Sequence, residues 1–318
     1  MSRFSSGSCR ATVAIPLYKS ALFFENIVSN IENISDPDIE IVISDRHCFD
    51  DTIDRLSKRY AGDARVRCLK HQDKLDWVAH INALLKEARG NYWRFLPHDD
   101  LSPPGSLEAL ITALDSNADA ILSYGPTLAI DGDGRRLIER DCLTPHPIEA
   151  AHTWSLGLVL QMFWRGYFNG AFKGVLRRTT VMKNRLLIRS TKDQIFPERC
   201  WLFALCLLGR FHFVPEASYI KRFYCGSIHS GWEITGSNYL SAAETMSEYL
   251  NKLLTPGTAR RYGKQDLFLN AQCFAQWRDS SSDARPPYMA ALGAQVEQIR
   301  SLRLPHSAGF FDFGRFRS

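Results

Sequence analysis

Four short apolar runs, each followed by a segment with helical periodicity, constrain the fold of this chain more than any other feature. The runs are rich in β-branched and aromatic residues and occupy residues 11–16, 39–44, 66–69 and 92–96. Parallel strands need a crossover connection, which is usually a helix, so a repeated strand–helix alternation favours them. The sequence therefore predicts the α/β class, with a mostly parallel sheet flanked by helices.

The fourth run, Tyr92–Leu96, ends in two adjacent carboxylates. Pro97 cannot extend an interior ladder, so His98, Asp99 and Asp100 should project beyond the carboxyl end of the strand. In open α/β sheets, ligands bind at that edge. Two neighbouring negative charges are costly unless a positive charge lies against them, and a divalent cation is a candidate. The alternative is a solvated turn that caps the next helix.

The first two runs should end at the same edge, which places Pro16, Tyr18 and Asp45 near the carboxylate pair. A dinucleotide-binding fold fits the alternation too, but Pro-Leu-Tyr-Lys follows the first strand where a glycine-rich phosphate cradle would be needed. The diphosphate of a bound nucleotide would then need another partner, and a metal held by carboxylates fits that need. Alternatively, Asp45 caps a turn and Tyr18 packs against the sheet edge.

Composition narrows the functional classes. The 318 residues are 45% hydrophobic and 23% charged, with a net charge of +5 and basic residues dispersed among acidic ones. Nucleic-acid binding is therefore not expected, whereas phosphate-bearing substrates or an anionic membrane surface suit the mild positive charge. The eight cysteines include no Cys-x-x-Cys pair, which argues against a zinc cluster and a disulfide scaffold and favours reduced thiols.

Targeting signals are also weak. The first ten residues are polar and lack the apolar core of a secretory signal. The apolar stretches 154–164 and 200–208 are shorter than the roughly 20 residues that cross a bilayer as a helix. We expect a cytoplasmic protein, with peripheral contact at the inner face of the membrane as an option.

In order and spacing, these segments resemble the family 2 glycosyltransferases of the GT-A fold. The resemblance rests on Ile15–Tyr18, Ile41–Asp45, Asp50–Thr52, the helix between Asn82 and Gly90, and His98–Asp100. It extends from about residue 11 to about residue 222. It implies a metal-dependent, inverting transfer of one sugar from a nucleotide-diphosphate sugar to an acceptor hydroxyl. A glycan or lipid-linked acceptor in cell-surface glycan synthesis is implied as well.

The resemblance assigns nucleotide contacts to several residues. Pro16 and Tyr18 match the segment that lines the base, and Asp45 matches the acidic residue that grips the base or ribose. Lys74 is a candidate contact to the diphosphate or base, with a solvated lysine as the alternative. Arg222 is a candidate contact to the diphosphate, because the family often places a basic residue and a later histidine in this region.

The resemblance also divides the carboxylate pair. Asp99 matches the position that faces the ribose and diphosphate, and Asp100 matches the direct ligand of Mn²⁺ or Mg²⁺. His98 stands where the family often has an acidic residue, and histidine is itself a metal ligand, so it is a candidate second ligand. His229 is a weaker candidate.

Asp193 is the expected catalytic base. The family carries a Glu-Asp pair here; Lys192 replaces the glutamate, but Asp193 remains. An inverting transfer needs a carboxylate that takes the proton from the attacking hydroxyl. The alternative is that Asp193 only caps the following helix.

The resemblance divides the chain into a polar tail (1–10), a GT-A domain (11–235) and a helical C-terminal extension (236–318). The domain comprises a nucleotide-sugar half (11–100) and an acceptor half (101–235), and the extension is a candidate homodimer surface. The Gln-x-x-Arg-Trp element of processive members is absent, which favours single addition. Two alternatives remain: a sugar-nucleotide-binding scaffold without turnover, and a sugar-phosphate nucleotidyltransferase, whose glycine-rich, arginine-bearing loop is missing.

Overall fold

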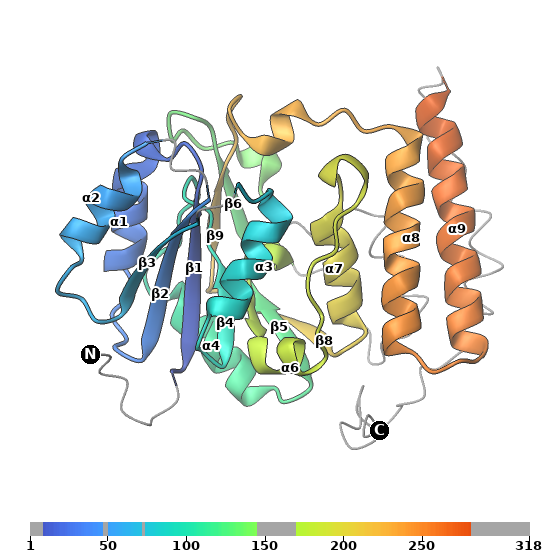
Figure 1. Cartoon of the computed structure of the whole chain (residues 1–318), viewed down its shortest axis with the longest axis horizontal. Coiled ribbons are helices and arrows are strands. Elements are labelled where there is room, and N and C mark those ends of the chain that lie inside the picture. Colours follow the sequence, from blue (N-terminus) through green and yellow to red (C-terminus); the bar gives the residue numbers. More distant parts are fainter. Residues whose placement is uncertain (1–8, 47–49, 72–73, 145–169, 281–318) are drawn as a thin grey trace.

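A seven-stranded sheet with helices on both faces forms the centre of the fold (Figure 1). The computed structural model describes residues 9–46, 50–71, 74–144 and 170–280. The strand order is β3-β2-β1-β4-β7-β5-β8, and within these residues β7 alone runs antiparallel to its neighbours. This confirms the mostly parallel sheet. The strands are β1 (Ala11–Leu17), β2 (Ile39–Asp45), β3 (Val66–Lys70), β4 (Tyr92–Phe95), β5 (Ala120–Tyr124), β7 (Val175–Arg177) and β8 (Arg210–Phe213).

Both faces of the sheet are covered, so the central strands are mostly apolar, and their polar residues Thr12 and Arg94 are buried. Along β1, Val13 and Ile15 pack toward one core and Ala14 toward the other, as expected from the two-residue period of a strand. The first core is completed by α1 (Phe24–Glu32), α2 (Thr52–Arg59) and α4 (Ser106–Ser116). The second core contains side chains of α3 (Trp77–Glu87), α6 (Arg178–Lys183) and α7 (Pro197–Cys206).

A small second sheet brings a distant segment to the edge where β4 ends. It consists of β6 (Thr127–Ile130) and β9 (Tyr219–Arg222), which run parallel. Leu101, just after the carboxylate pair, forms a bridge with Ile220 of β9. Residues more than 100 positions apart therefore lie together at this edge.

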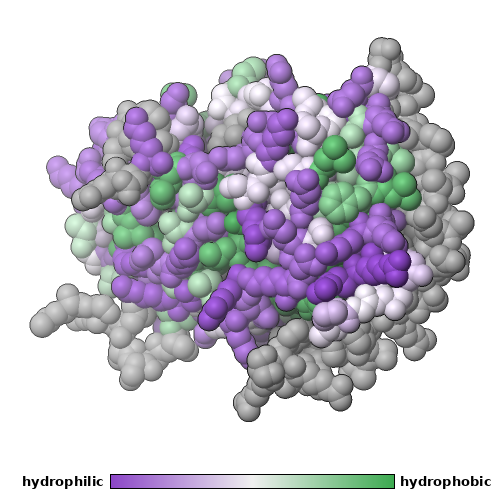
Figure 2. Space-filling view, turned by 45° about the vertical axis from the view of Figure 1, so that its right-hand side comes forward, coloured by the Kyte–Doolittle hydropathy of each residue, from purple (hydrophilic) through white to green (hydrophobic). Residues whose placement is uncertain are grey.

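The C-terminal extension begins with two long antiparallel helices, α8 (Gly236–Leu253) and α9 (Thr258–Asp279), beside α7 (Figure 1). Thr235 and Asn238 form a capping box that starts α8. Figure 2 shows a face that these helices help to form, where hydrophilic side chains predominate and smaller hydrophobic areas lie between them. Residues 1–8 of the tail and 281–318 of the extension lie outside the described residues. None of the helices that the structure describes has the length and hydropathy needed to cross a bilayer.

Candidate active site

A pocket of about 380 Å³ opens at the carboxyl ends of β1 and β4. Its volume is within the range of small-molecule sites. Five basic and three acidic side chains line it, a balance that suits an anionic ligand. These are Lys19, Arg46, Lys173, Lys221, Arg222, Asp99, Asp100 and Glu198. Six of the residues predicted from the sequence line the pocket: Pro16, Tyr18, His98, Asp99, Asp100 and Arg222.

Asp100 is a buried carboxylate whose two oxygens are both hydrogen-bonded within the protein. Oδ1 accepts the backbone N–H of Arg222 at 2.8 Å, and Oδ2 accepts the hydroxyl of Tyr219. Its side chain is only 3% exposed. Burial, and then the charge of Asp99, raises the pKa of Asp100 to about 6. The small sheet thus holds Asp100 through β9.

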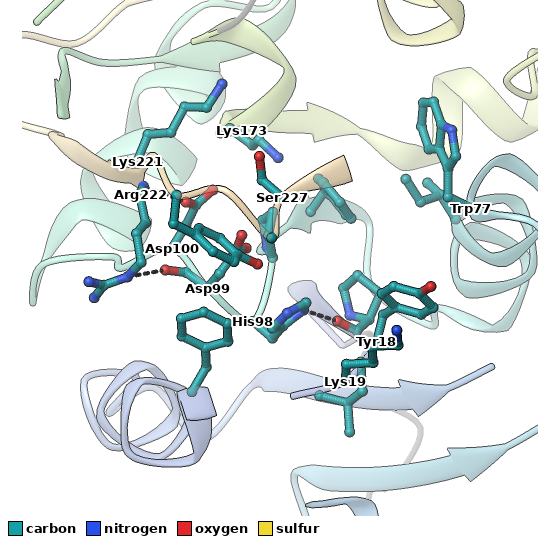
Figure 3. Close-up of a pocket in the computed structure, with 18 of the residues that line it drawn as sticks. Tyr18, Lys19, Trp77, His98, Asp99, Asp100, Lys173, Lys221, Arg222 and Ser227 are labelled. Atoms are coloured by element: carbon teal, nitrogen blue, oxygen red, sulfur yellow. Dashed lines mark hydrogen bonds between the residues drawn. The ribbon is translucent and has the colours of Figure 1, made fainter. Parts of the chain in front are cut away.

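Asp99 and His98 complete the loop after β4. The Tyr224 hydroxyl lies against the Asp99 carboxylate. Burial, followed by the charge of Asp99 and a hydrogen bond between the two side chains, raises the pKa of this hydroxyl. The Nδ1–H of His98 donates to the carbonyl of Pro16 at 3.2 Å (Figure 3), and the ring packs against Phe23. Burial lowers the pKa of His98, which favours the neutral imidazole.

Arg222 ties the site together through backbone carbonyls. Its Nε donates to the carbonyl of Asp99 at 3.1 Å (Figure 3), and its Nη1 donates to the carbonyls of Asp131 and Gly132 at 3.1 and 3.0 Å. The guanidinium therefore connects the loop after β4 with the turn after β6. It lines the predicted phosphate region but also serves as a structural clamp.

Lys173 and Glu198 are pocket residues that the sequence interpretation missed. Lys173 ends the single 3₁₀ turn Ala171–Lys173, and burial lowers the pKa of its ammonium group to about 8. Glu198 lies in the first turn of α7 and is 7% exposed, and its Oε2 has no hydrogen-bond partner among the described residues. Burial raises the pKa of this carboxyl. A buried polar atom without a partner, in the wall of a pocket, marks a position that a ligand can satisfy.

Three predicted site residues are not part of this pocket. Asp193 is exposed and lines an adjacent hollow, which shares Trp77 and Trp232 with the pocket. Its Oδ2 accepts a hydrogen bond from Asn238 at 3.1 Å. Asp193 does not cap α7, which starts at Pro197, so that alternative is wrong. Asp45 is buried at the end of β2 and Lys74 is exposed; neither lines the pocket.

Tyr18 and Lys19 lie at the opposite side of the pocket from Arg222 (Figure 3). The guanidinium of Arg46 lies over the Tyr18 ring, 4.5 Å from its centroid. Arg46 also donates to the carbonyl of Leu75 at 3.0 Å, which fixes its side chain. An aromatic ring stacked with a guanidinium is a surface against which a flat nucleobase can lie.

The residues predicted to bind a metal, Asp100 and His98, already make hydrogen bonds within the protein. Both oxygens of Asp100 already accept hydrogen bonds, and the Lys173 ammonium places a positive charge near both carboxylates. In the part of the chain that the structure describes, no group of three His, Cys, Asp or Glu side chains could hold a metal ion. The side chain of His229 lies outside the described residues.

Comparison with known proteins defines the class. A structure of S. aureus TarS 1-349 in complex with UDP-GlcNAc superimposes with a TM-score of 0.63 at 16% identity, covering 92% of this chain and 84% of that one. A second structure of TarS 1-349, in complex with UDP, gives a TM-score of 0.58 at 13% identity and covers 82% and 71% of the two chains. The fold is therefore that of the GT-A glycosyltransferases.

The family follows from the sequence match. Residues 12–175 match the model of glycosyl transferase family 2, and the chain belongs to that family. An uncharacterized glycosyltransferase of Haemophilus influenzae is 24% identical over 131 residues, which is 41% of this chain and 38% of that protein. The GalNAc(5)-diNAcBac-PP-undecaprenol beta-1,3-glucosyltransferase of Campylobacter jejuni is 27% identical over 103 residues, which is 32% and 33% of the two proteins. The matches thus span 38% and 33% of the two relatives.

Proposed function

We propose that this chain is an inverting glycosyltransferase that moves one sugar from a nucleotide-diphosphate sugar to an acceptor hydroxyl. The observation that carries this proposal is the pocket at the carboxyl ends of β1 and β4, where an excess of basic side chains lies beside the buried Glu198, whose Oε2 has no hydrogen-bond partner among the described residues. The basic residues complement a diphosphate, and the carboxylate can accept a proton.

Glu198 is our first choice for the base. In the reaction, the acceptor oxygen forms a bond to the anomeric carbon while the bond from that carbon to the diphosphate oxygen breaks. The hydroxyl proton moves to Oε2 of Glu198, and the electron pair of the broken bond leaves with the diphosphate. Glu198 shares a pocket with Asp99 and Asp100, whereas Asp193 reaches only the adjacent hollow. Asp193 remains the sequence-based alternative.

The nucleotide is proposed to occupy the other side of the pocket. Pro16 and the stacked Tyr18 and Arg46 are suited to the base, and Asp99 to the ribose and diphosphate. Asp45 and Lys74 do not line the pocket. They therefore remain candidate nucleotide contacts on the resemblance alone.

The acceptor and the cellular location are proposals drawn from the relatives. The Campylobacter jejuni enzyme is named for a substrate on an undecaprenol carrier, so a glycan or lipid-linked acceptor at the cytoplasmic face of a membrane is a reasonable class to test. Single addition is proposed on the absence of the processive element. The α8–α9 pair is proposed as the surface for an acceptor carrier or for a second copy of the chain.

The proposal is tested with a panel of UDP-, GDP- and dTDP-sugars. Donor hydrolysis and transfer are followed by nucleotide release, and the product anomer by NMR, for the wild type, Glu198→Gln and Asp193→Asn. Removing a general base typically costs about 10²- to 10⁴-fold in rate. We expect that loss for Glu198→Gln, with donor binding retained, and a much smaller effect for Asp193→Asn.

The opposite pattern, in which only Asp193→Asn loses turnover, would restore Asp193 as the base. Retention of the donor's anomeric configuration would contradict the inverting mechanism. If nucleotide binds but the wild type neither transfers nor hydrolyses any donor, the binding-scaffold alternative is favoured.

A further inference from the structure

A positively charged side chain of the protein lines the same pocket as the carboxylate pair. Two adjacent carboxylates, here the half-buried Asp99 and the buried Asp100, are costly unless a positive charge lies close to them. The sequence suggested a divalent cation for that position. In the structure, the charge of the Lys173 ammonium interacts with Asp100 and Asp99, and Lys173 and Lys221 lie on one side of these carboxylates (Figure 3).

Lys173 is held from several directions. Its ammonium lies over the rings of Phe95 and Phe172, with Nζ 4.2 and 5.3 Å from the two centroids. Its backbone carbonyl accepts a hydrogen bond from Nε of the buried Arg94 at 3.2 Å. Desolvated cation–π contacts stabilise an ammonium in place. Lys173 is therefore a positioned charge, unlike a solvated lysine.

Gly174 makes this placement possible. A Cβ at Gly174 would lie 2.1 Å from the carbonyl oxygen of Ser123 on β5, so only glycine allows the chain to approach the sheet so closely here. The turn Ala171–Lys173 can then point its last side chain into the pocket. The close approach of the backbone at Gly174 thus determines where the Lys173 side chain enters the pocket.

The carboxylates, in contrast, are engaged with the protein. Asp100 is held by Tyr219 and by the backbone of Arg222, and the Tyr224 hydroxyl lies against Asp99. A hard divalent cation takes several oxygen ligands, at about 2.0–2.1 Å for Mg²⁺. At Asp100 it would have to share oxygens that already accept hydrogen bonds, and it would approach an ammonium group that lines the same pocket.

We propose that Lys173, assisted by Lys221, neutralises the leaving diphosphate in place of a divalent cation, so that this enzyme binds and uses its donor without a metal. The proposal rests on the proposed function. As the bond between the anomeric carbon and the diphosphate oxygen breaks, the electron pair stays on that oxygen. The Lys173 ammonium donates hydrogen bonds to the charge that develops there, and the step needs no added proton or oxidant.

The test uses the full chain after dialysis against EDTA. Binding of UDP, GDP and dTDP is measured by calorimetry in EDTA and again with excess Mn²⁺. Mn²⁺ alone and with nucleotide is followed by EPR, which reports bound metal independently of activity. We expect equal nucleotide affinity in the two buffers, within about twofold, and a free-ion Mn²⁺ signal with protein alone.

Substitutions of single lysines test which side chain supplies the positive charge that binds the diphosphate. Lys173→Met should weaken nucleotide binding by about 10- to 100-fold, the range expected for losing a hydrogen bond from a charged group. Lys173→Arg should retain part of the affinity. Lys58→Met removes an equal charge from an exposed position of α2 and should leave affinity unchanged. Circular dichroism and melting temperature confirm that each variant is folded.

The outcomes separate this inference from the function on which it rests. Binding that Mn²⁺ strengthens more than about tenfold, with loss of the free-ion signal, would overturn the metal-independent reading and leave the glycosyltransferase proposal standing. Unchanged affinity in Lys173→Met would overturn the role of Lys173. A complete lack of nucleotide binding in both buffers would contradict the proposed function itself.

Discussion

At the scale of single residues, the burial of Glu198 has a consequence for the pH dependence of the reaction. A general base works only when it is ionised, and burial raises the pKa of this carboxyl above its usual value of about 4.3. The charges of Arg199, Lys173 and Lys221 act in the opposite direction but are smaller effects. We expect kcat/KM to fall as the pH is lowered through the raised pKa, measured from about pH 5 to about pH 8.

Asp100 titrates in the same pocket, with a pKa of about 6, so the two carboxyls must be separated. Nucleotide binding measured over the same pH range follows titration near the diphosphate, which includes Asp100. The Glu198→Gln variant, in contrast, removes only the titration of the proposed base. The fall in kcat/KM at low pH, which is the acid limb of the pH profile, should therefore be absent from the residual activity of Glu198→Gln. A limb that persists unchanged in this variant would assign it to another group.

The two candidate bases, Asp193 and Glu198, show how far the sequence alone could predict this part of the site. The resemblance led to Asp193, because Asp193 stands at the aspartate of the family's Glu-Asp pair, with Lys192 in place of the glutamate. In the structure, Ile195 and Phe196 separate the 3₁₀ turn of Asp193 from α7, and Phe196 has a φ of 73°. This conformation starts the helix later, so that Glu198 reaches the pocket. A left-handed phenylalanine is not visible in a hydrophobic pattern.

At the scale of secondary-structure elements, Gly90 sets the distance between the end of α3 and β1. A Cβ at Gly90 would lie 2.4 Å from the backbone of Ala11 and Thr12, which cannot move without disturbing the sheet. We expect Gly90→Ala to lower the free energy of unfolding by about 1–3 kcal/mol, the usual cost of overpacking. Urea denaturation measures the change.

Gly62→Ala is the matched control, because a Cβ there meets nothing within 4 Å. At such a site, loss of unfolded-state entropy stabilises a protein by about 0.4–1 kcal/mol. The two variants should therefore shift the urea midpoint in opposite directions. Equal midpoints would show that the β1 edge relaxes around the added methyl group.

Elements with a strong local pattern were predictable, and elements that depend on distant partners were not. The runs at β1, β2, β3 and β4 were identified because they are rich in β-branched, aromatic and other apolar residues, and β2 and β4 are buried along their whole length. The segment around Lys173 depends on such distant partners. It forms a 3₁₀ turn followed by the short β7, and its lysine is fixed by Phe95 and Arg94, nearly 80 residues earlier in the chain.

At the scale of the whole molecule, the C-terminal helices are part of the same packed structure as the sheet. Side chains of α8, among them Met246 and Leu250, belong to the hydrophobic core that also contains Trp93 and Trp201. Two hydrogen bonds also connect α8 to the segment before α7. The hydroxyl of Tyr249 donates to the carbonyl of Leu187 at 2.9 Å and accepts the N–H of Arg189 at 2.9 Å. Residue 235 therefore marks a boundary along the sequence, but the segments before and after it share one hydrophobic core.

This shared core predicts that α8 unfolds together with the sheet. Leu250 is fully buried, and truncating a buried leucine to alanine costs about 2–5 kcal/mol. We expect Leu250→Ala to lower the midpoint of a single calorimetric transition, because the lost contacts join α8 to the rest of the core. Binding of UDP in the pocket should raise that same midpoint in wild type and variant alike, since a ligand of the folded state stabilises every part that unfolds with it. Two transitions, of which UDP raises one and Leu250→Ala lowers the other, would instead make the extension an independent domain.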